Sequence, residues 1–259
     1  MIEAKSISYQ VSDTYLVKSL SAKFNVGEMT AIMGANGAGK STLLKLLTGA
    51  LKPSSGNVLY KDKDLSVYTS EELAKERAVL SQSYQLNFPI TVADIIMMGR
   101  YPYFSASPTL HDQAITDSAI HTLGIKHLLD RDYNTLSGGE AQKVQMARVL
   151  AQVWQNKGDQ PKALYLDEPV SSLDMKYQHE ILGIAKRFSE AGNAVIIVLH
   201  DVNLALQYAD TIYFMKDSEL QYTYSSGQNL DLDSLHRVFD VRFEIIQTEV
   251  GRQFLVTAV

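Results

Sequence analysis

The stretch Gly34-Ala35-Asn36-Gly37-Ala38-Gly39-Lys40-Ser41-Thr42 follows the apolar run Met29–Met33 and precedes the apolar segment Leu43–Leu47. It fits the phosphate-binding pattern Gly-x-x-x-x-Gly-Lys-[Ser/Thr] without a mismatch. A strand, a glycine-rich turn and a helix start form an anion site together, because unpaired backbone N–H groups and the helix dipole converge there. A glycine-rich turn that arose by chance would not need a strand before it and a helix after it. The stretch therefore predicts a site for a nucleoside triphosphate with magnesium.

Two side chains of this phosphate loop have specific partners in such a site. Lys40 would reach the β- and γ-phosphates, and the Ser41 hydroxyl would bind Mg²⁺. The glycines let the backbone curl around a phosphate chain without Cβ clashes. The loop is thus expected to supply both the cationic contact and one oxygen ligand of the metal.

A second group of polar residues ends a strand of the buried type. Ala163–Leu166 is continuously apolar, and Asp167 and Glu168 come directly after it. In phosphate-loop enzymes a carboxylate in this position holds Mg²⁺ through water, which is the role we expect for Asp167. Glu168 would polarise the attacking water. Asp-Glu-Pro is also a common polar strand end in any α/β protein, but its pairing with a phosphate loop favours the catalytic interpretation.

The composition is typical of a globular protein. The chain has 259 residues, of which 46% are hydrophobic and 20% charged. Its longest apolar run, Ala194–Leu199, falls far short of the roughly 18 to 20 residues that a membrane span needs, and no apolar secretory region follows Met1–Lys5. The absence of cysteine excludes disulfides. The formal net charge of −5 gives no support to nucleic acid as the main partner.

The pattern of apolar residues predicts alternating strands and helices. We expect strands within 2–26 (broken at 12–14) and at 29–33, 57–60, 78–82, 163–167, 193–199, 211–215 and 220–224. We expect helices after the phosphate loop to near 49, from 70, from 91 to 98, and at 111–123, after 137, 177–189 and 232–239. Turns are expected at 61–64 and a loop at 101–104. Continuous apolar strands favour an α/β core with a mostly parallel sheet.

The pentapeptide Leu136-Ser137-Gly138-Gly139-Glu140 opens a segment whose apolar residues recur every three or four positions from Val144 to Trp154. It predicts another helix N-terminus with bare N–H donors. A lone Ser-Gly-Gly is equally a serine N-cap followed by flexible glycines. Here it matches the signature of the ATP-binding-cassette (ABC) family, which the chain resembles over nearly its whole length.

The resemblance rests on motifs that stand in the family's order and spacing. They are the phosphate loop at 34–42, the loop glutamine Gln82, the signature at 136–140, the magnesium strand with its catalytic glutamate at 164–168, the dimer-contact loop at 172–174 and the switch histidine His200. Singly, Gln82 is typical of a surface residue and His200 of a structural one. The resemblance implies a P-loop (RecA-like) core with a mostly parallel sheet, an N-terminal antiparallel β subdomain and an inserted α-helical subdomain. We predict one domain over 1–259, with the nucleotide-binding core at 1–82 and 160–259 and the insert at about 83–159.

In the ABC family two subunits dimerise head to tail, with ATP between one phosphate loop and the other subunit's signature. The resemblance implies that the signature contacts the γ-phosphate on the partner's nucleotide, that His200 senses this phosphate, and that Asp174 helps to join the subunits. Gln82 would link Mg²⁺ to the helical insert. The residues assigned to the nucleotide are Gly34, Asn36, Gly37, Ala38, Gly39, Lys40, Ser41, Thr42, Ser137, Gly138, Gly139 and Asp174. Those assigned to catalysis are Glu168, His200, Gln82 and Lys40, and those assigned to the metal are Ser41, Gln82 and Asp167.

The resemblance also implies partners, with ATP and Mg²⁺ as the cofactors. They are a second ATPase subunit, two transmembrane permease subunits that dock on the helical insert and, indirectly, a substrate-binding protein. The expected place is the cytoplasmic face of the inner membrane. Thr91–Tyr103 looks like the ATPases of iron-siderophore, haem and cobalamin importers. Ala151–Gln155 followed by a polar insertion at Asn156–Lys162 resembles hemin importers in particular, although a surface loop also varies freely in length.

Three positions depart from the usual family pattern. Val11 stands where an aromatic residue usually stacks on adenine, so either Tyr9 or Tyr15 would have to substitute, or neither. Val170 replaces a threonine, with no catalytic consequence expected. Glu140 replaces the commoner glutamine of the signature, a variant found in importers.

Two other classes of protein compete with the transport ATPase. Soluble members of the family that act on ribosomes or DNA usually carry two cassettes or long coiled insertions and are often basic, unlike this acidic chain with one cassette. A nucleotide-gated module without hydrolysis would not need Lys40, Asp167, Glu168 and His200 together. The sequence therefore favours an ATP hydrolase that drives an importer, most like those for haem.

Overall fold

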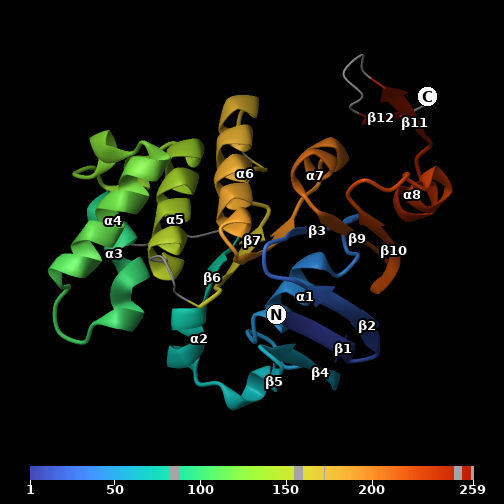
Figure 1. Ribbon diagram of the computed structural model, residues 1–259, viewed down its shortest axis with the longest axis horizontal. Coiled ribbons are helices and arrows are strands. Elements are labelled where there is room, and N and C mark those ends of the chain that lie inside the picture. The colour runs from blue at the N-terminus through green and yellow to red at the C-terminus, as the bar shows by residue number, and fades with distance from the viewer. Residues whose placement is uncertain (82–87, 155–159, 172, 248–252, 258–259) are drawn as a thin grey trace.

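The computed structural model describes residues 1–81, 88–154, 160–171, 173–247 and 253–257. Its strands form a four-stranded, a six-stranded and a two-stranded sheet, and its helices lie along the six-stranded sheet and at one end of the molecule (Figure 1). Gln82 of the predicted site, Ser172 of the predicted dimer-contact loop and residues 156–159 of the predicted insertion lie outside the described residues.

The N-terminal strands form the expected antiparallel sheet. It has the order β2-β1-β4-β5, with β1 (Ile2–Val11), β2 (Thr14–Phe24), β4 (Ser55–Tyr60) and β5 (Lys63–Asp64). The predicted break in the first strand pair is confirmed as a turn between β1 and β2. The predicted turn at 61–64 is wrong in its second half, because Lys63 and Asp64 pair with Tyr60 and Leu59.

The central sheet is mostly parallel, as predicted. Its order is β10-β9-β3-β8-β7-β6, with β3 (Met29–Gly34), β6 (Arg77–Leu80), β7 (Ala163–Asp167), β8 (Ala194–Val198), β9 (Thr211–Lys216) and β10 (Glu219–Ser225). All its pairs are parallel except the β9–β10 hairpin. Every residue of β3, β7 and β8 is buried. The carboxyl ends of these strands meet at one edge, where the polar motifs follow them.

Both faces of the central sheet are covered. Alternate residues of one strand therefore pack into different core clusters. In β8, Val195 and Ile197 belong to the core cluster that also contains α5 (Gly138–Val153), α6 (Met175–Glu190) and α7 (Val202–Tyr208). Ile196 and Val198 belong to the cluster with α1 (Lys40–Leu47) and the N-terminal sheet. Successive strand residues point to opposite faces, so the continuous apolar run is explained by burial on both sides.

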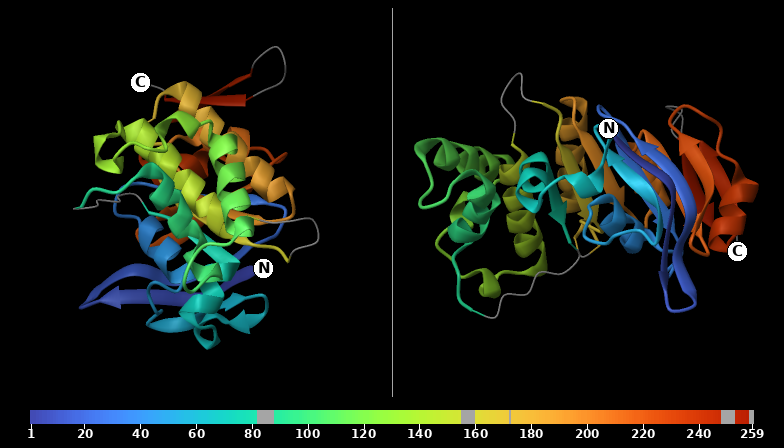
Figure 2. Two further views of the ribbon diagram at one scale, coloured as in Figure 1. Left: turned by 90° about the vertical axis from the view of Figure 1, so that its left-hand side faces the viewer. Right: turned by 90° about the horizontal axis from the view of Figure 1, so that it is seen from below.

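A group of helices occupies the region between β6 and β7. It contains α3 (Val92–Met97), η2 (Met98–Tyr103), α4 (Leu110–Leu123), η3 (Lys126–Leu128), η4 (Tyr133–Thr135) and α5, where η marks a 3₁₀ helix. Figure 2 shows this helical group at the opposite end of the molecule from the C-terminal hairpin. The helices predicted from 91, at 111–123 and after 137 are confirmed. The loop predicted at 101–104 is wrong, since the chain is a 3₁₀ helix as far as Tyr103.

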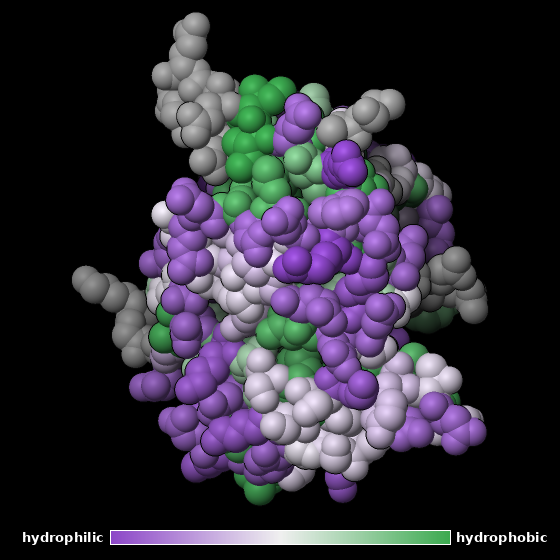
Figure 3. Space-filling view, turned by 90° about the vertical axis from the view of Figure 1, so that its right-hand side faces the viewer, coloured by the Kyte–Doolittle hydropathy of each residue, from purple (hydrophilic) through white to green (hydrophobic). Residues whose placement is uncertain are grey.

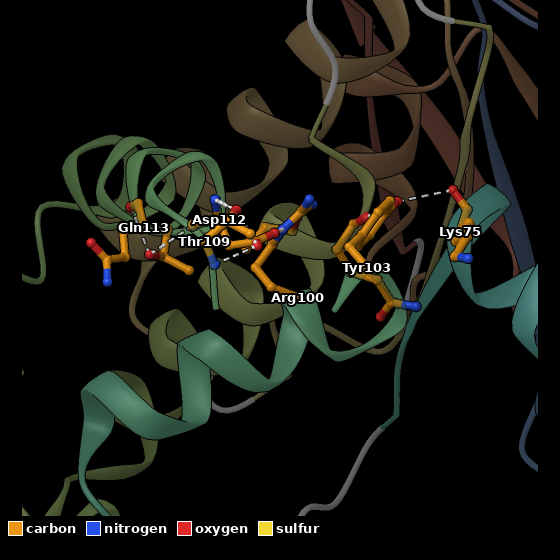
Figure 4. Close-up of polar contacts among 9 residues, drawn as sticks. Lys75, Arg100, Tyr103, Thr109, Asp112 and Gln113 are labelled. Atoms are coloured by element: carbon orange, nitrogen blue, oxygen red, sulfur yellow. Dashed lines mark hydrogen bonds and ion pairs between the residues drawn. The ribbon is translucent and has the colours of Figure 1, made fainter. Parts of the chain in front are cut away.

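Buried polar contacts explain why this segment is ordered as η2 (Figure 4). Arg100 is 3% exposed; its Nε donates to Asp112 Oδ1 at 3.0 Å, and a second guanidinium nitrogen donates to Ala151 O at 2.8 Å. The guanidinium lies 3.8 Å from the centre of the Tyr103 ring. The Tyr103 hydroxyl contacts Lys75 O and Gln152 O. These contacts fix η2 to α4, to α5 and to the core helix α2 (Ser70–Glu76).

The C-terminal part adds α7, α8 (Leu232–Phe239) and the hairpin of β11 (Phe243–Gln247) and β12 (Gln253–Thr257), and η1 (Leu65–Val67) precedes α2. The helix predicted at 232–239 is confirmed, whereas α7 was not predicted. The Asn203 side chain of α7 bonds both backbone polar groups of Leu255 and so fixes the hairpin. Figure 3 shows hydrophobic surface at the end of the molecule where this hairpin lies. No helix within the described ranges has the length and apolar character to cross a membrane.

Candidate nucleotide site

The phosphate loop connects β3 to α1 at the edge where the parallel strands end. At two of its glycines the neighbouring backbone leaves no room for a side chain. A Cβ at Gly34 would lie 2.1 Å from Met215 O, and a Cβ at Gly39 would lie 2.1 Å from Leu16 O. Gly39 also has φ +98°, in the left-handed region that other residues avoid. The backbones of β2 and β9 thus close on the loop and fix its path.

The N-terminus of α1 has no side-chain cap. Gly39 takes the N-cap position, and the first turn carries no acidic side chain. Because the first N–H groups of a helix have no partner inside the helix, this end presents backbone donors and the positive end of the helix dipole. That arrangement binds phosphate at helix starts.

Lys40 is 6% exposed and curls back onto the loop. Its Nζ donates to Gly34 O at 2.9 Å and to Ala35 O at 3.0 Å. Burial lowers the pKa of Lys40, while the charges of Glu168 and Asp167 act in the opposite direction. The ammonium therefore lies between the loop and the two acidic residues that follow β7.

Ser41 and Asp167 come together from different elements. Ser41 Oγ, in the first turn of α1, donates to Asp167 Oδ1 at 3.2 Å, at the end of β7. Asp167 is 8% exposed, and burial raises its pKa, although the hydrogen bond from Ser41 counteracts this. Both line one hollow beside α1, together with Lys45 and Ser81. A buried carboxylate next to a hydroxyl, both at a strand edge, is an oxygen donor set suited to Mg²⁺.

Glu168 and His200 also meet at this edge. Glu168 Oε1 lies 2.5 Å from His200 Nε2. The two residues follow β7 and β8, which are parallel neighbours, so their side chains project from adjacent strand ends. Glu168 has φ +51°, a left-handed conformation that is uncommon for a non-glycine residue. Its side chain is 14% exposed and that of His200 is 42% exposed, and both line a second hollow with Asp201 and Ser171.

The structure therefore brings Lys40, Ser41, Asp167, Glu168 and His200 to one edge, as their predicted roles require. The signature residues lie elsewhere, at the start of α5. Gly139 is close to the Leu173 side chain, and Gln142 Nε2 donates to Pro169 O. Ser137 and Gly138 are exposed at the surface.

Asp174 is exposed as well and serves locally as the N-cap of α6, where its Oδ1 accepts from Tyr177 N at 3.1 Å. Within one chain, the signature and Asp174 thus belong to separate helix starts from the phosphate loop. Their assigned roles toward a partner's nucleotide remain predictions.

The two tyrosines considered for adenine stacking lie in different surroundings. Tyr15 is 44% exposed and immediately precedes Leu16, whose carbonyl lies against Gly39. Tyr9 is partly buried and packs against the core cluster that contains α1. Of the two tyrosines, Tyr15 is therefore the more exposed and the one beside the phosphate loop, and the stacking role stays a prediction.

The family described as ABC transporter matches residues 17–171, more than half of the chain, including the phosphate loop, the signature and Glu168. The chain belongs to the ABC transporter family. It is an ABC-type transport ATPase.

Curated relatives of this ABC ATPase carry the name hemin import ATP-binding protein. The protein of Gloeobacter violaceus is 43% identical over 85% of this chain and 80% of its own length. That of Rhodopseudomonas palustris (strain BisA53) is 38% identical over 98% and 93%. That of Hahella chejuensis is 37% identical over 99% of both chains.

Solved ABC structures share the fold of this ABC ATPase. One is an inward-facing conformation of a putative metal-chelate type ABC transporter, with a TM-score of 0.81 and 24% identity over 100% of this chain and 97% of that chain. Another is a dimeric ATP-binding cassette in a post-hydrolysis state bound to ADP and Pi, with a TM-score of 0.76 and 24% identity over 88% and 100%. These likenesses confirm the predicted fold class.

Two contacts in the ABC signature region are not among the sequence-based predictions. Glu140 folds back on Ser137, and Arg131 contacts Glu140. The spacing Ser-x-x-Glu is a recognised capping pattern and was sufficient to predict the first contact. Nothing in the local sequence indicated the second.

Proposed function

We propose that this ABC ATPase powers a membrane importer for haem. The observation that carries the proposal is the similarity to proteins named hemin import ATP-binding protein, at 37–43% identity and, for two of them, over nearly the whole of both chains. The sequence features that favoured haem over a ferric siderophore or cobalamin point the same way.

Two copies of the chain would bind head to tail, with each ATP between one phosphate loop and the other copy's signature. The exposure of Ser137 and Gly138, on a different helix from the phosphate loop, supports this arrangement. So does the dimeric state of the related cassette bound to ADP and Pi. The signature N–H donors would then stabilise the transferring phosphate only when the dimer is closed.

Within each site the residues at the strand edge divide the work. The loop from Gly34 to Thr42 holds the phosphate chain, with Lys40 on the β- and γ-phosphates. Glu168 polarises the attacking water, and the contact with His200 fixes the direction of its carboxylate. His200 in turn would report the γ-phosphate to the rest of the dimer, together with Gln82 and Asp174.

Ser41 and Asp167 would hold Mg²⁺. Their oxygens lie 3.2 Å apart, and Mg²⁺ in nucleotide sites takes one or two protein oxygens with the rest from water and phosphate. Within the described ranges no group of three or more His, Cys, Asp or Glu is arranged to hold a metal ion alone. When bound, the ion neutralises charge on the β- and γ-phosphates. Burial raises the pKa of Asp167, and a bound Mg²⁺ would place a positive charge beside this carboxylate and so favour its ionised form.

The membrane partners would be two permease subunits, which the segment Val92–Tyr103 of the helical group contacts, with a substrate-binding protein on the far side. Tyr101 in this segment is 56% exposed, whereas Arg100 beside it is buried in the ion pair that fixes η2. An exposed aromatic on a rigid support suits a docking surface. The ATPase would lie peripherally on the cytoplasmic face of the inner membrane.

The test is uptake by this subunit reconstituted in liposomes with its permease and binding protein. Haem, a ferric siderophore and cobalamin are supplied in turn, and ATP turnover and uptake are measured for each. We expect stimulation and uptake with haem. Uptake of the siderophore or cobalamin instead would overturn the cargo and leave the transport ATPase in place.

A further inference from the structure

The start of α5 is closed by its own carboxylate. Glu140 Oε2 accepts from the backbone N–H of Ser137 at 2.8 Å and lies 2.8 Å from Ser137 Oγ, which donates to it. Ser137 Oγ accepts in turn from Glu140 N at 3.3 Å. Arg131 donates to the other carboxylate oxygen, Oε1, at 3.1 Å and to Thr135 O at 2.9 Å. We call these contacts of Ser137, Glu140 and Arg131 the signature cap.

The signature cap uses one of the donors that a phosphate would need, the Ser137 hydroxyl. A serine hydroxyl has one hydrogen to donate, and Ser137 gives it to Glu140. A hydrogen bond to a carboxylate is about twice as strong as one between neutral groups. A phosphate oxygen must therefore displace the carboxylate from the hydroxyl, or share the site with a second negative charge.

We propose that Glu140 weakens, and Arg131 restores, the affinity of the signature for the γ-phosphate on a second copy's ATP, so that this pair of charges sets the ATP concentration at which the dimer closes. The inference rests on the proposed function, since it concerns the signature opposite a partner's nucleotide. Glu140 and Arg131 are positioning residues here, because they act through Ser137 and through charge.

The charge effect has a definite size and a definite dependence on salt. Two unit charges a few ångströms apart at a protein surface attract or repel one another, and the effect weakens when water and salt screen them. Glu140 is partly exposed, with 32% of its side chain accessible, and Arg131 is 43% exposed. We therefore expect a change of about fivefold in the ATP requirement rather than the loss of activity that follows from removing a catalytic group.

The chain contains a matched control in the capping box of α2. There Glu72 Oε2 accepts from Thr69 N at 2.7 Å and from Thr69 Oγ1 at 2.9 Å, and Glu72 N donates back at 3.2 Å. The local geometry is that of the signature cap, but the residue lies on another helix and is assigned no nucleotide. Because glutamine also forms capping boxes, Glu140→Gln and Glu72→Gln both remove a charge and keep the cap.

The experiment measures ATP-driven dimerisation of the full-length chain by analytical ultracentrifugation in Glu168→Gln protein, where hydrolysis is blocked. Adding Glu140→Gln should lower the half-saturating ATP concentration about fivefold at low salt, and the difference should fade near 1 M NaCl. Arg131→Gln should raise that concentration while Glu140 is present and change it much less when combined with Glu140→Gln. Glu72→Gln should change the melting temperature and leave the half-saturating ATP concentration as it is.

The outcomes separate this inference from the function on which it rests. If the Glu168→Gln protein forms no dimer with ATP, both are overturned. If it dimerises with the same ATP requirement with and without Glu140→Gln, only the role of the signature cap is overturned. A shift that persists unchanged in 1 M NaCl, or an equal shift from Glu72→Gln, would also contradict it.

Discussion

Helix α1 follows its N-cap Gly39 and has neither a side-chain cap nor an acidic residue in its first turn. Helix α5, in contrast, starts with a capping box formed by Ser137 and Glu140. Both helix starts follow glycine-containing motifs and both are assigned to phosphate contacts. In α1, Lys40 adds a buried cation. In α5, the carboxylate of Glu140 accepts from the N–H and from the hydroxyl of Ser137.

The difference leads us to expect separate tasks for the two helix starts at the nucleotide. An uncapped helix start with a lysine suits a polyphosphate within a single chain, because its first backbone N–H groups have no partner inside the helix. At the start of α5 the Ser137 hydroxyl already donates to Glu140, so a phosphate gains that donor only in exchange for an existing hydrogen bond. Such a contact suits a step that must reverse in each cycle, when the dimer opens.

The largest expected effect comes from blocking hydrolysis while both helix starts stay intact. Glu168→Gln should lower kcat on the order of 10³-fold, because a neutral amide is a poor acceptor for the proton of the attacking water. ATP affinity should be kept, since Lys40 and the α1 terminus are unchanged. Single-turnover hydrolysis and equilibrium binding of ATP measure the two quantities. Hydrolysis close to the wild-type rate would show that Glu168 is not the residue that polarises water.

A pair of glycine substitutions compares the two helix starts directly. Gly39→Ala places a Cβ 2.1 Å from Leu16 O at φ +98°, so the phosphate loop must move, and turnover should fall on the order of 100-fold with weakened ATP binding. Gly138→Ala meets no atom within 4 Å. ATP binding to one chain should stay normal, and turnover should fall only about tenfold, through the obstructed closed dimer.

Isothermal titration and steady-state turnover report both members of the pair. Equal loss of ATP affinity in the two variants would remove the distinction between a site within one chain and a site that needs a partner.

Contiguous motifs account for the part of the site that was predictable from sequence. Gly34–Thr42 carries its own strand and helix start, and Asp167 and Glu168 directly follow an apolar run, so their neighbourhood could be inferred from short segments. That Glu168 contacts His200 depends on the pairing of β7 with β8, which is not among the sequence-based predictions.

Tertiary contacts decided the elements that were missed. The residues of η2 include a proline and resemble a loop, but Arg100 finds a buried carboxylate in Asp112, which comes from another helix. Arg131 reaches Glu140 because η4 turns the chain back between them. The sequence signal for the short helix α7 is its N-cap Asp201, whose side chain accepts from the N–H groups of Asn203 and Leu204. The apolar pattern of α7 is too brief to predict a helix by itself. The domain boundaries and the residue roles remain predictions.

The smallest expected effect concerns the carboxylates that contact the two helix starts, Asp167 beside Ser41 of α1 and Glu140 in the first turn of α5. Burial raises the pKa of Asp167, whereas hydrogen bonds from Ser137, with Arg131 nearby, lower the pKa of Glu140. An acid whose pKa is raised by folding destabilises the folded state once it ionises, so its cost is absent below the unfolded-state pKa and complete above the folded-state pKa. An acid whose pKa is lowered stabilises the fold above its unfolded-state pKa and loses this as the pH falls.

Asp167→Asn should therefore raise the free energy of unfolding of the nucleotide-free protein by about 1 kcal/mol at neutral pH. Glu140→Gln should change it in the opposite direction. Urea unfolding in EDTA, repeated as the pH is lowered, measures both, and both differences should shrink toward acid pH. If Asp167→Asn destabilised the nucleotide-free protein at neutral pH, its carboxylate would be satisfied before the metal and nucleotide bind. The contrast would then be wrong between a carboxylate that destabilises the empty α1 site and one that stabilises the start of α5.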